Sequence, residues 1–218
     1  MRLRPTRALA PAYFARPTLD VAHDLIGMVL VHDTAAGVAG GVIVEVEAYI
    51  GEDDPACHAA PGPTRRNEPL YGPPGVAYVY FNYGVHWLVN AVTEPEGSPA
   101  AVLIRALEPA AGLDLMRARR STRRADVERE WTGNVAELCR GPGNLTRALA
   151  ITGAQNRAPL DGGPLRIEQP PGPAGRLPVA WSPRIGIRVG TEHHWRATVA
   201  GHKSVSGRVV RLKPYTTR

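Results

Sequence analysis

The sequence has little cysteine, little lysine and no long hydrophobic run. Cys57 and Cys139 are the only cysteines in 218 residues, too few for a disulfide framework, so a reducing cytoplasm is the expected location. The only lysines, Lys203 and Lys213, lie near the end of the chain, which argues against a lysine Schiff-base nucleophile. No run of about 18 apolar residues occurs, so no transmembrane helix is expected. The basic start, MRLRPTRALAPAYFARP, has no continuous apolar segment, so no secretory signal is expected.

The length suits one domain with a substantial core. A net charge of +6 and an isoelectric point near 9.7 favour a polyanionic partner such as nucleic acid. The many arginine, alanine, glycine and proline residues also fit a GC-rich coding bias, so charge alone leaves the partner open.

The hydrophobic periodicity predicts strands that alternate with short helices. A helix is expected over residues 17–26 with Thr18 as its N-cap, and a second over 109–120 with proline in its first turn. Residues 51–74 and 159–183 are rich in proline and glycine, and the second stretch is expected to be an irregular surface excursion. The remaining predicted strands are 28–32, 41–50, 76–81, 85–92, 101–107, 184–189 and 208–212, and short helical segments are predicted at 134–139 and 145–151.

The segment VIVEVEAYI (residues 42–50) carries two acids and an aromatic at every second position. Because side chains alternate across a strand, Glu45, Glu47 and Tyr49 should share one face while the aliphatic residues enter the core. Such acids often only solubilise a sheet. A second strand rich in tyrosine, ending at the turn Asn82-Tyr83-Gly84, favours a site for a flat base.

The long loop after this strand holds His58 directly after Cys57, and also Arg65 and Arg66. A loop of this length inside a compact domain is usually functional or disordered, and its contents suit a functional one. The Cys-His pair lacks spaced partners such as CxxC or HxxxH, so no metal site is expected.

Several stretches together resemble one family, the alkyladenine (3-methyladenine) DNA glycosylases of the methylpurine type. They are LIGMVLV, VEVEAYIGEDDPACH, TRRN, YVYFNYGVHWLVNAV, VLIRALEP and LCRGPGNLTRALAI, in the order the family has them. The resemblance implies one α+β domain over residues 1–218, with a mostly antiparallel curved sheet flanked by helices and a protruding β-hairpin. It also implies a monofunctional enzyme that flips a damaged purine nucleotide out of DNA and hydrolyses its N-glycosidic bond.

The resemblance also implies roles for individual residues. Glu47 would activate water, because a carboxylate both stabilises an oxocarbenium-like sugar and accepts a proton, and Arg105 would assist it. Tyr83 would enter the duplex as a wedge. The residues implied around the flipped base are Tyr49, His58, Tyr80 and Asn90.

Other assignments are looser. Arg65 and Arg66 are candidate phosphate contacts, as is the basic cluster of residues 117–124, although a basic run is more often a solvated face. The expected partner is double-stranded DNA with damaged purines, bound by a monomer in the cytoplasm, associated with the nucleoid. No cofactor, metal or membrane is expected.

Three alternatives stay open at this point. Glu45 lies about 6–7 Å along the strand from Glu47 and competes for the role of base, although it is assigned to structure or ion pairing. Tyr78 is taken as a core residue rather than a base contact. The chain as a whole could be a non-catalytic nucleic-acid-binding module with the same sheet architecture, or a nucleoside hydrolase.

Overall fold

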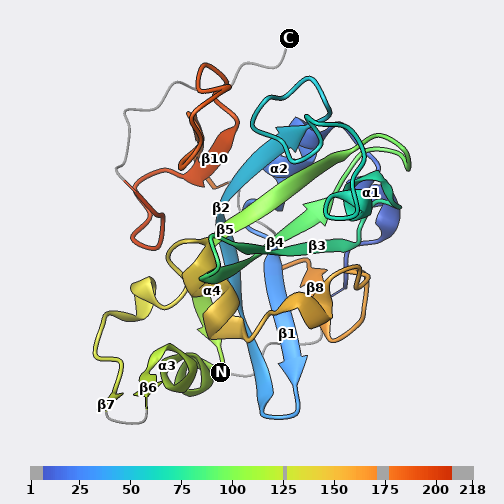
Figure 1. The fold of residues 1–218 in the computed structure, drawn as a ribbon. Coiled ribbons are helices and arrows are strands. Elements are labelled where there is room, and N and C mark those ends of the chain that lie inside the picture. The colour runs from blue at the N-terminus through green and yellow to red at the C-terminus, as the bar shows by residue number, and fades with distance from the viewer. Residues whose placement is uncertain (1–6, 125–126, 171–176, 208–218) are drawn as a thin grey trace.

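A long curled antiparallel sheet forms the centre of the molecule, and short helices cover parts of it (Figure 1). The computed structural model describes residues 7–124, 127–170 and 177–207. The strands are β1 (Val29–Thr34), β2 (Gly37–Ile50), β3 (Ala77–Asn82), β4 (His86–Val92), β5 (Ala100–Ala111), β6 (Thr122–Arg124), β7 (Val127–Arg129), β8 (Leu165–Glu168), β9 (Val179–Ser182) and β10 (Arg196–Val199). The α-helices are α1 (Pro11–Phe14), α2 (Thr18–Leu25), α3 (Leu113–Arg120) and α4 (Pro142–Leu149), and the 3₁₀ turns are η1 (Glu68–Tyr71), η2 (Val135–Glu137) and η3 (Gly153–Gln155).

Strand β2 organises the sheet because it has three neighbours. Strand β5 pairs along most of its length, while β1 pairs with its first half and β10 with Glu45 to Glu47. The order β3-β4-β5-β2-β1-β8 therefore branches at β2, where β10 and then β9 continue it. Helix α4 packs on β4 and β5, and α2 packs on β2. The expected single-domain α+β fold with a curved antiparallel sheet is confirmed.

The alternation expected in β2 is broken by a bulge. The register with β5 shifts between Ile43 and Val46, so that neighbouring Ile43 and Val44 both enter the core. Glu45 and Glu47 still lie together, but both are fully buried, at 0 % exposure. The alternative that these acids only solubilise the sheet is therefore wrong.

The predicted hairpin forms between β3 and β4, and Tyr83 lies at its tip. The amide of Val85 donates to the carbonyl of Asn82 at 3.0 Å. The left-handed positions are Tyr83 (φ 50°) and Gly84 (φ 67°), not Asn82, which belongs to β3. Both central residues of the turn from Asn82 to Val85 have positive φ, which matches the right-handed twist of the strands.

Two helix boundaries differ from the prediction. Strand β5 continues to Ala111, and α3 starts only after Gly112 has turned the chain at φ 70°. A Cβ there would lie 2.3 Å from the carbonyl oxygen of Val38, so the close approach of β2 requires glycine. Thr18 is the first residue of α2 rather than its N-cap, and its hydroxyl bonds the side chains of Thr93 and Glu94 instead. None of the helices in the described ranges is long and apolar enough to span a membrane.

Two segments in the last third of the chain differ from their predicted secondary structure. Residues 159–183 are not simply a surface excursion, because β8 and β9 lie within them and Leu165 and Ile167 are in the core. Residues 184–189, predicted as a strand, form bends and irregular backbone, because Arg184 bonds Asp54 and the Ile185 amide bonds Glu47 instead of a neighbouring strand. The strand predicted at 208–212 lies outside the described residues.

Candidate active site

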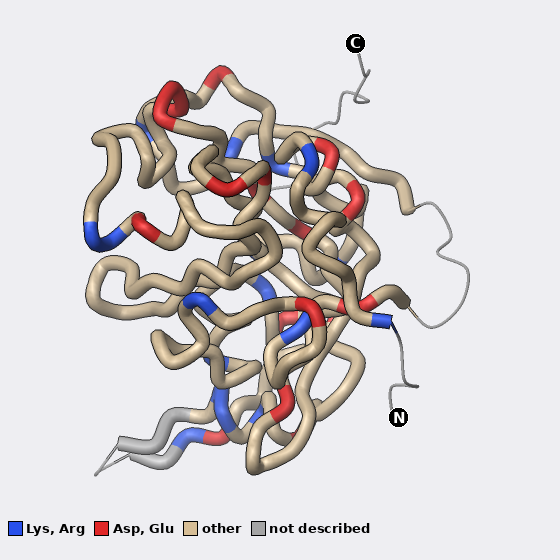
Figure 2. Tube along the Cα trace, turned by 90° about the vertical axis from the view of Figure 1, so that its right-hand side faces the viewer, with Lys and Arg blue, Asp and Glu red and all other residues tan. Residues whose placement is uncertain are grey.

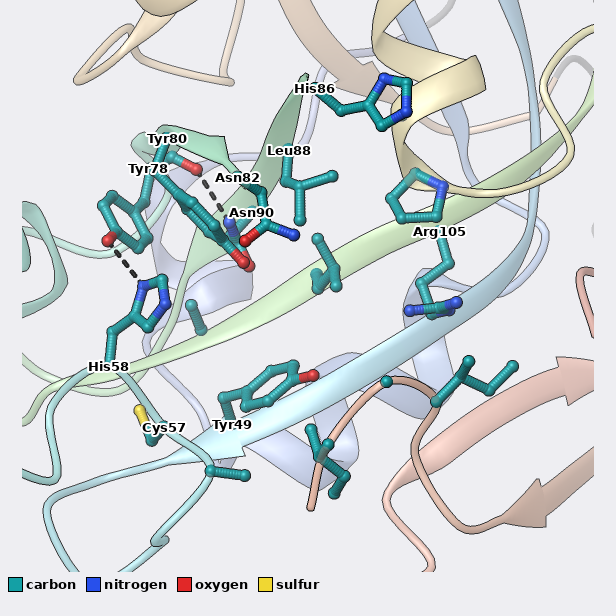
Figure 3. Close-up of a pocket in the computed structure, with 18 of the residues that line it drawn as sticks. Tyr49, Cys57, His58, Tyr78, Tyr80, Asn82, His86, Leu88, Asn90 and Arg105 are labelled. Carbon is teal, nitrogen blue, oxygen red and sulfur yellow. Dashed lines mark hydrogen bonds between the residues drawn. The ribbon is translucent and has the colours of Figure 1, made fainter. Parts of the chain in front are cut away.

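A cavity of about 740 Å³ opens between the β3–β4 hairpin and the ends of β2 and β5, a size typical of ligand pockets. The start of α4 and the loop of residues 183–190, named here the 183–190 loop, complete its wall. Figure 3 shows Tyr49, which projects from β2, across the cavity from Tyr78 and Tyr80 of β3. Five of the predicted site residues line it, namely Tyr49, His58, Tyr80, Asn90 and Arg105, and so does Tyr83 at its mouth.

The hairpin presents one face to this cavity because its two strands pair in register. Tyr78 lies opposite Asn90, and Tyr80 lies opposite Leu88, so these four side chains share a face. The amide nitrogen of Asn90 donates to the carbonyl of Tyr78 at 2.9 Å, which fixes the Asn90 side chain (Figure 3). Tyr78 is buried as expected, but it also lines the cavity.

His58 meets the hairpin aromatics from the long loop. Its Nδ1 lies 2.9 Å from the hydroxyl of Tyr78, and its ring centre lies 4.5 Å from that of Tyr80. Burial, and then the nearby Arg66 guanidinium, lower the pKa of His58, while burial raises the pKa of Tyr78 to about 12. A neutral imidazole against neutral phenols is therefore favoured at pH 7.

Asn67 holds the loop that carries His58. Its amide nitrogen donates to the carbonyls of His58 (2.7 Å) and Gly62 (2.9 Å), and its oxygen accepts from the amide of Thr64 (2.6 Å). The side chain is almost fully buried, at 1 % exposure. The Asn67 side chain thus supplies hydrogen-bond partners to the backbone of a segment with little regular secondary structure.

Glu47 lies directly behind the cavity wall and accepts three hydrogen bonds. The hydroxyl of Tyr49 (2.9 Å) and Nη1 of Arg105 (3.1 Å) donate to Oε2, and the amide of Ile185 (2.7 Å) donates to Oε1. All three donor residues line the cavity. Burial and then the charge of Glu47 raise the pKa of Tyr49, so this hydroxyl stays a donor.

Glu45 is the more heavily bonded of the two acids. Its Oε1 accepts from Nε of Arg105 (2.9 Å), Nε of Arg196 (2.8 Å) and the hydroxyl of Ser206 (2.8 Å), and its Oε2 accepts from the Ser206 amide (2.6 Å). Burial alone would lower the pKa of Arg105, but Glu47 and Glu45 together raise it. The guanidinium between the two carboxylates therefore remains charged.

Tyr83 projects from the tip of the hairpin into solvent. Its side chain is 87 % exposed, and Phe81 and Val85 beside it are also exposed. Phe81 contacts the ring of Trp87, with 4.8 Å between the ring centres. The tip is thus an apolar projection at the edge of the cavity, supported from below by an aromatic pair.

Comparison with known proteins matches this geometry to one family. The sequence profile of the methylpurine-DNA glycosylase (MPG) family matches residues 12–203. The chain is 46% identical over 210 residues to a protein of Burkholderia lata assigned by name as a 3-methyladenine DNA glycosylase, covering 95% of both chains. It is 48% identical over 200 residues to a protein of the same name in Bradyrhizobium diazoefficiens, covering 92% of this chain and 91% of that one.

The chain belongs to the methylpurine-DNA glycosylase family. It is a DNA repair glycosylase, and the resemblance that the sequence motifs indicated is confirmed. The same finding confirms the expected enzyme class, a monofunctional hydrolase of N-glycosyl bonds, over a binding module without activity.

The arginines considered as phosphate contacts, and those that pack beside them, fall into two groups. Arg65 and Arg66 are exposed on the long loop, where the Arg66 guanidinium lies 5.6 Å from the ring centre of Tyr80. Arg119 and Arg147, by contrast, donate to the backbone carbonyls that end α3 and α4, so this part of the predicted basic cluster supports the fold. The side chains of Arg123 and Arg124 lie outside the described residues. Figure 2 shows basic residues interspersed with acidic ones along the chain.

Some residues of the glycosylase site were missed in the sequence. Arg184 and Arg196 are buried, and each bonds a buried acid, Asp54 and Glu45 respectively. A buried arginine must be paired, but the sequence around these two does not show that they are buried. The Ile185 amide could not have been found, since any backbone N–H looks alike in a sequence.

Proposed function

We propose that this glycosylase flips an alkylated or deaminated purine nucleotide out of duplex DNA and hydrolyses its N-glycosidic bond, with Glu47 activating the water. The product would be free base and an abasic site. Flipping is required because the sugar carbon C1′ cannot be reached inside a stacked duplex.

The observation that supports Glu47 as the base is its unused acceptor capacity. A carboxylate has about four acceptor positions, and Glu47 uses three, with only the Ile185 amide on Oε1. One position remains for a water beside the cavity wall. Glu45 already accepts four hydrogen bonds, three of them from Arg196 and Ser206, which do not line the cavity, and this supports its assignment to structure.

The aromatic side chains across the cavity would hold the base. Tyr49 on one side and Tyr80 with His58 on the other offer ring faces to a planar purine. Stacking contributes about 1–3 kcal/mol per base and strengthens when the base carries a positive charge, as alkylated purines do. We place Asn90 at the edge of the base, where its fixed amide can discriminate between exocyclic groups.

The reaction then needs few groups. The oxygen of water attacks C1′ while one of its protons moves to Glu47, and the C1′–N bond breaks with its electron pair moving to the base. An alkylated cationic base leaves neutral, so it needs no acid, whereas a neutral deaminated base such as hypoxanthine leaves as an anion that takes a proton from solvent. The charged Arg105 helps to hold the water and the Glu47 carboxylate, and within the described part of the chain no lysine lines the cavity to form a covalent adduct.

Base release from DNA with a single hypoxanthine tests this proposal. The wild type should produce abasic sites, detected by alkaline strand cleavage, and Glu47→Gln should lower the single-turnover rate at least about 10²-fold, the usual contribution of a general base. Glu52→Gln is the matched control, because Glu52 is exposed and accepts a hydrogen bond from the hydroxyl of Tyr71, away from Glu47. The proposal fails if Glu47→Gln keeps the wild-type rate, or if free nucleosides are cleaved as fast as DNA.

The partner and location follow from the same proposal. A monomer suffices, because the cavity, its aromatic walls and both acids come from one chain. We propose that it acts on nucleoid DNA in the cytoplasm, with Tyr83 entering the duplex and Arg65 and Arg66 near phosphates. Sedimentation of the protein with one lesion duplex should give a 1:1 complex.

A further inference from the structure

Asp54 and Arg184 form a fully enclosed ion pair just outside the cavity. The distances are 2.5 Å from Nη1 to Oδ2 and 2.8 Å from Nη2 to Oδ1, and both side chains are 0 % exposed. Burial alone would lower the pKa of Arg184, but the bonded Asp54 outweighs it and raises the pKa. The two planar groups thus meet in the bidentate arrangement that arginine favours.

Asp54 connects this pair to the loop that carries His58. Its Oδ2 accepts from the amide of Ile50 (3.2 Å) and its Oδ1 from the amide of Ala56 (3.1 Å). Ile50 is the last residue of β2, and Ala56 stands two residues before His58. Asp54 therefore fixes the direction in which the long loop leaves the sheet.

Arg184 connects the pair to the other side of the site. Its guanidinium carbon lies 4.6 Å from the ring centre of Tyr49, and Nη1 also donates to the carbonyl of Ala48 at 3.0 Å. The next residue, Ile185, gives its amide to Glu47. One side chain thus sets both the ring of Tyr49 and the N–H that holds the carboxylate.

A gain in stability alone does not explain why the fold contains a buried ion pair here. Burying two charges carries a desolvation penalty that their attraction offsets only with good geometry, and well-packed apolar residues often serve as well. Here the contacts instead converge on Glu47 and Tyr49. Since Asp54 neutralises the guanidinium beside it, the Tyr49 ring can still face a cationic base.

We propose that Arg184, locked by Asp54, is a positioning residue for base hydrolysis, which fixes the Ile185 amide and the Tyr49 ring relative to Glu47. It does not touch the substrate. The inference rests on the proposed role of Glu47, and it assigns the 183–190 loop a part in the chemical step rather than in DNA affinity.

Arg184→Lys tests the inference, because lysine keeps the charge but loses the bidentate bond and the planar contact with Tyr49. The single-turnover rate of hypoxanthine release should fall at least tenfold. The Kd for the same duplex, measured in a Glu47→Gln background that does not cut, should change less than threefold. If the lysine variant does not fold, Asp54→Asn, which keeps the shape of the side chain, should likewise lower the rate at least tenfold and change the Kd less than threefold.

Arg166→Lys is the matched control, since it makes the same exchange in an ion pair with Glu168 on β8, away from the cavity, and it should keep the wild-type rate. Thermal unfolding should accompany each assay. The inference is overturned if Arg184→Lys only lowers Tm and its rate stays within threefold of wild type. It is also overturned if affinity and rate fall together. Failure of the proposed function would look different, because the wild type itself would then release no base.

Discussion

Glu45 and Glu47 bind the same guanidinium, that of Arg105, through Nε at 2.9 Å and Nη1 at 3.1 Å. They differ in what else surrounds them. Glu45 lies among Arg196, Ser206 and β10, inside the fold. In the described ranges, the residues that bond Glu47 all line the cavity. One arginine thus joins a structural acid to the proposed catalytic acid.

This relationship predicts opposite effects for the two glutamine variants. Glu45→Gln should lower the free energy of unfolding by about 3–5 kcal/mol, because the buried Arg196 then loses the carboxylate that compensates its charge. Glu47→Gln should lose activity with a smaller loss of stability, since Arg105 keeps Glu45. Urea unfolding, beside base release, measures both. Equal destabilisation by the two substitutions would contradict the division of roles.

Tyr83→Gly should separate function from stability at the hairpin tip. Tyr83 has φ 50°, a left-handed conformation that disfavours side chains, so glycine there should leave the unfolding free energy unchanged or raise it by up to about 1 kcal/mol. Without the ring, however, nothing fills the gap left by a flipped nucleotide. A wedge recovers a few kcal/mol of unstacking, so base release from duplex DNA should fall at least tenfold.

Single-stranded DNA with the same lesion is the control for the wedge. An unpaired base is already partly unstacked, so the loss of Tyr83 should matter less there. A rate loss of equal size on single and double strands would show that Tyr83 contributes to the chemistry or to general binding instead.

The sequence predicted the strands β1 to β5, the hairpin and the gathering of aromatic residues, because these follow from local periodicity and turn chemistry. Tyr49 was placed on the face of Glu45 and Glu47 by the alternation of side chains along the strand. The 183–190 loop was not predictable in this way. Its alternating aliphatic residues predict a strand, yet Arg184 bonds Asp54, which stands 130 residues away, and such a tertiary contact overrides local preference.

The depth of Glu47 was also not predictable from the strand pattern. Alternation indicates which side chains share a face, but not what covers that face. Part of the cover comes from the 183–190 loop, which donates the Ile185 amide to Glu47 and follows far later in the chain. Similarly, Gly112 ends β5 because of the carbonyl of Val38 on a neighbouring strand, a constraint that no local propensity contains.

His58 should make stability depend on pH in mildly acidic solution. Burial and Arg66 lower its pKa below the ordinary 6.5. Below about pH 6.5 the unfolded chain therefore binds a proton before the folded chain does, and the contribution of His58 to stability is lost as pH falls toward the folded pKa. Urea unfolding at pH 7.5 and 5.5 should show a larger loss for the wild type than for His58→Gln. If both proteins lose stability equally, His58 is not held neutral.

The two groups of arginines should respond differently to salt. Arg66 is exposed beside the cavity, so if it contacts a phosphate, Arg66→Gln should reduce the slope of log K against log salt by about one and weaken binding to all sequences. Arg119 donates to the carbonyl of Ala148 and the hydroxyl of Thr34. Arg119→Gln should therefore leave the slope unchanged and lower stability by about 1 kcal/mol instead. Titration of lesion duplexes at several salt concentrations, in the Glu47→Gln background, measures the slopes. A reduced slope for Arg119→Gln would mean that the end of α3 reaches the DNA after all.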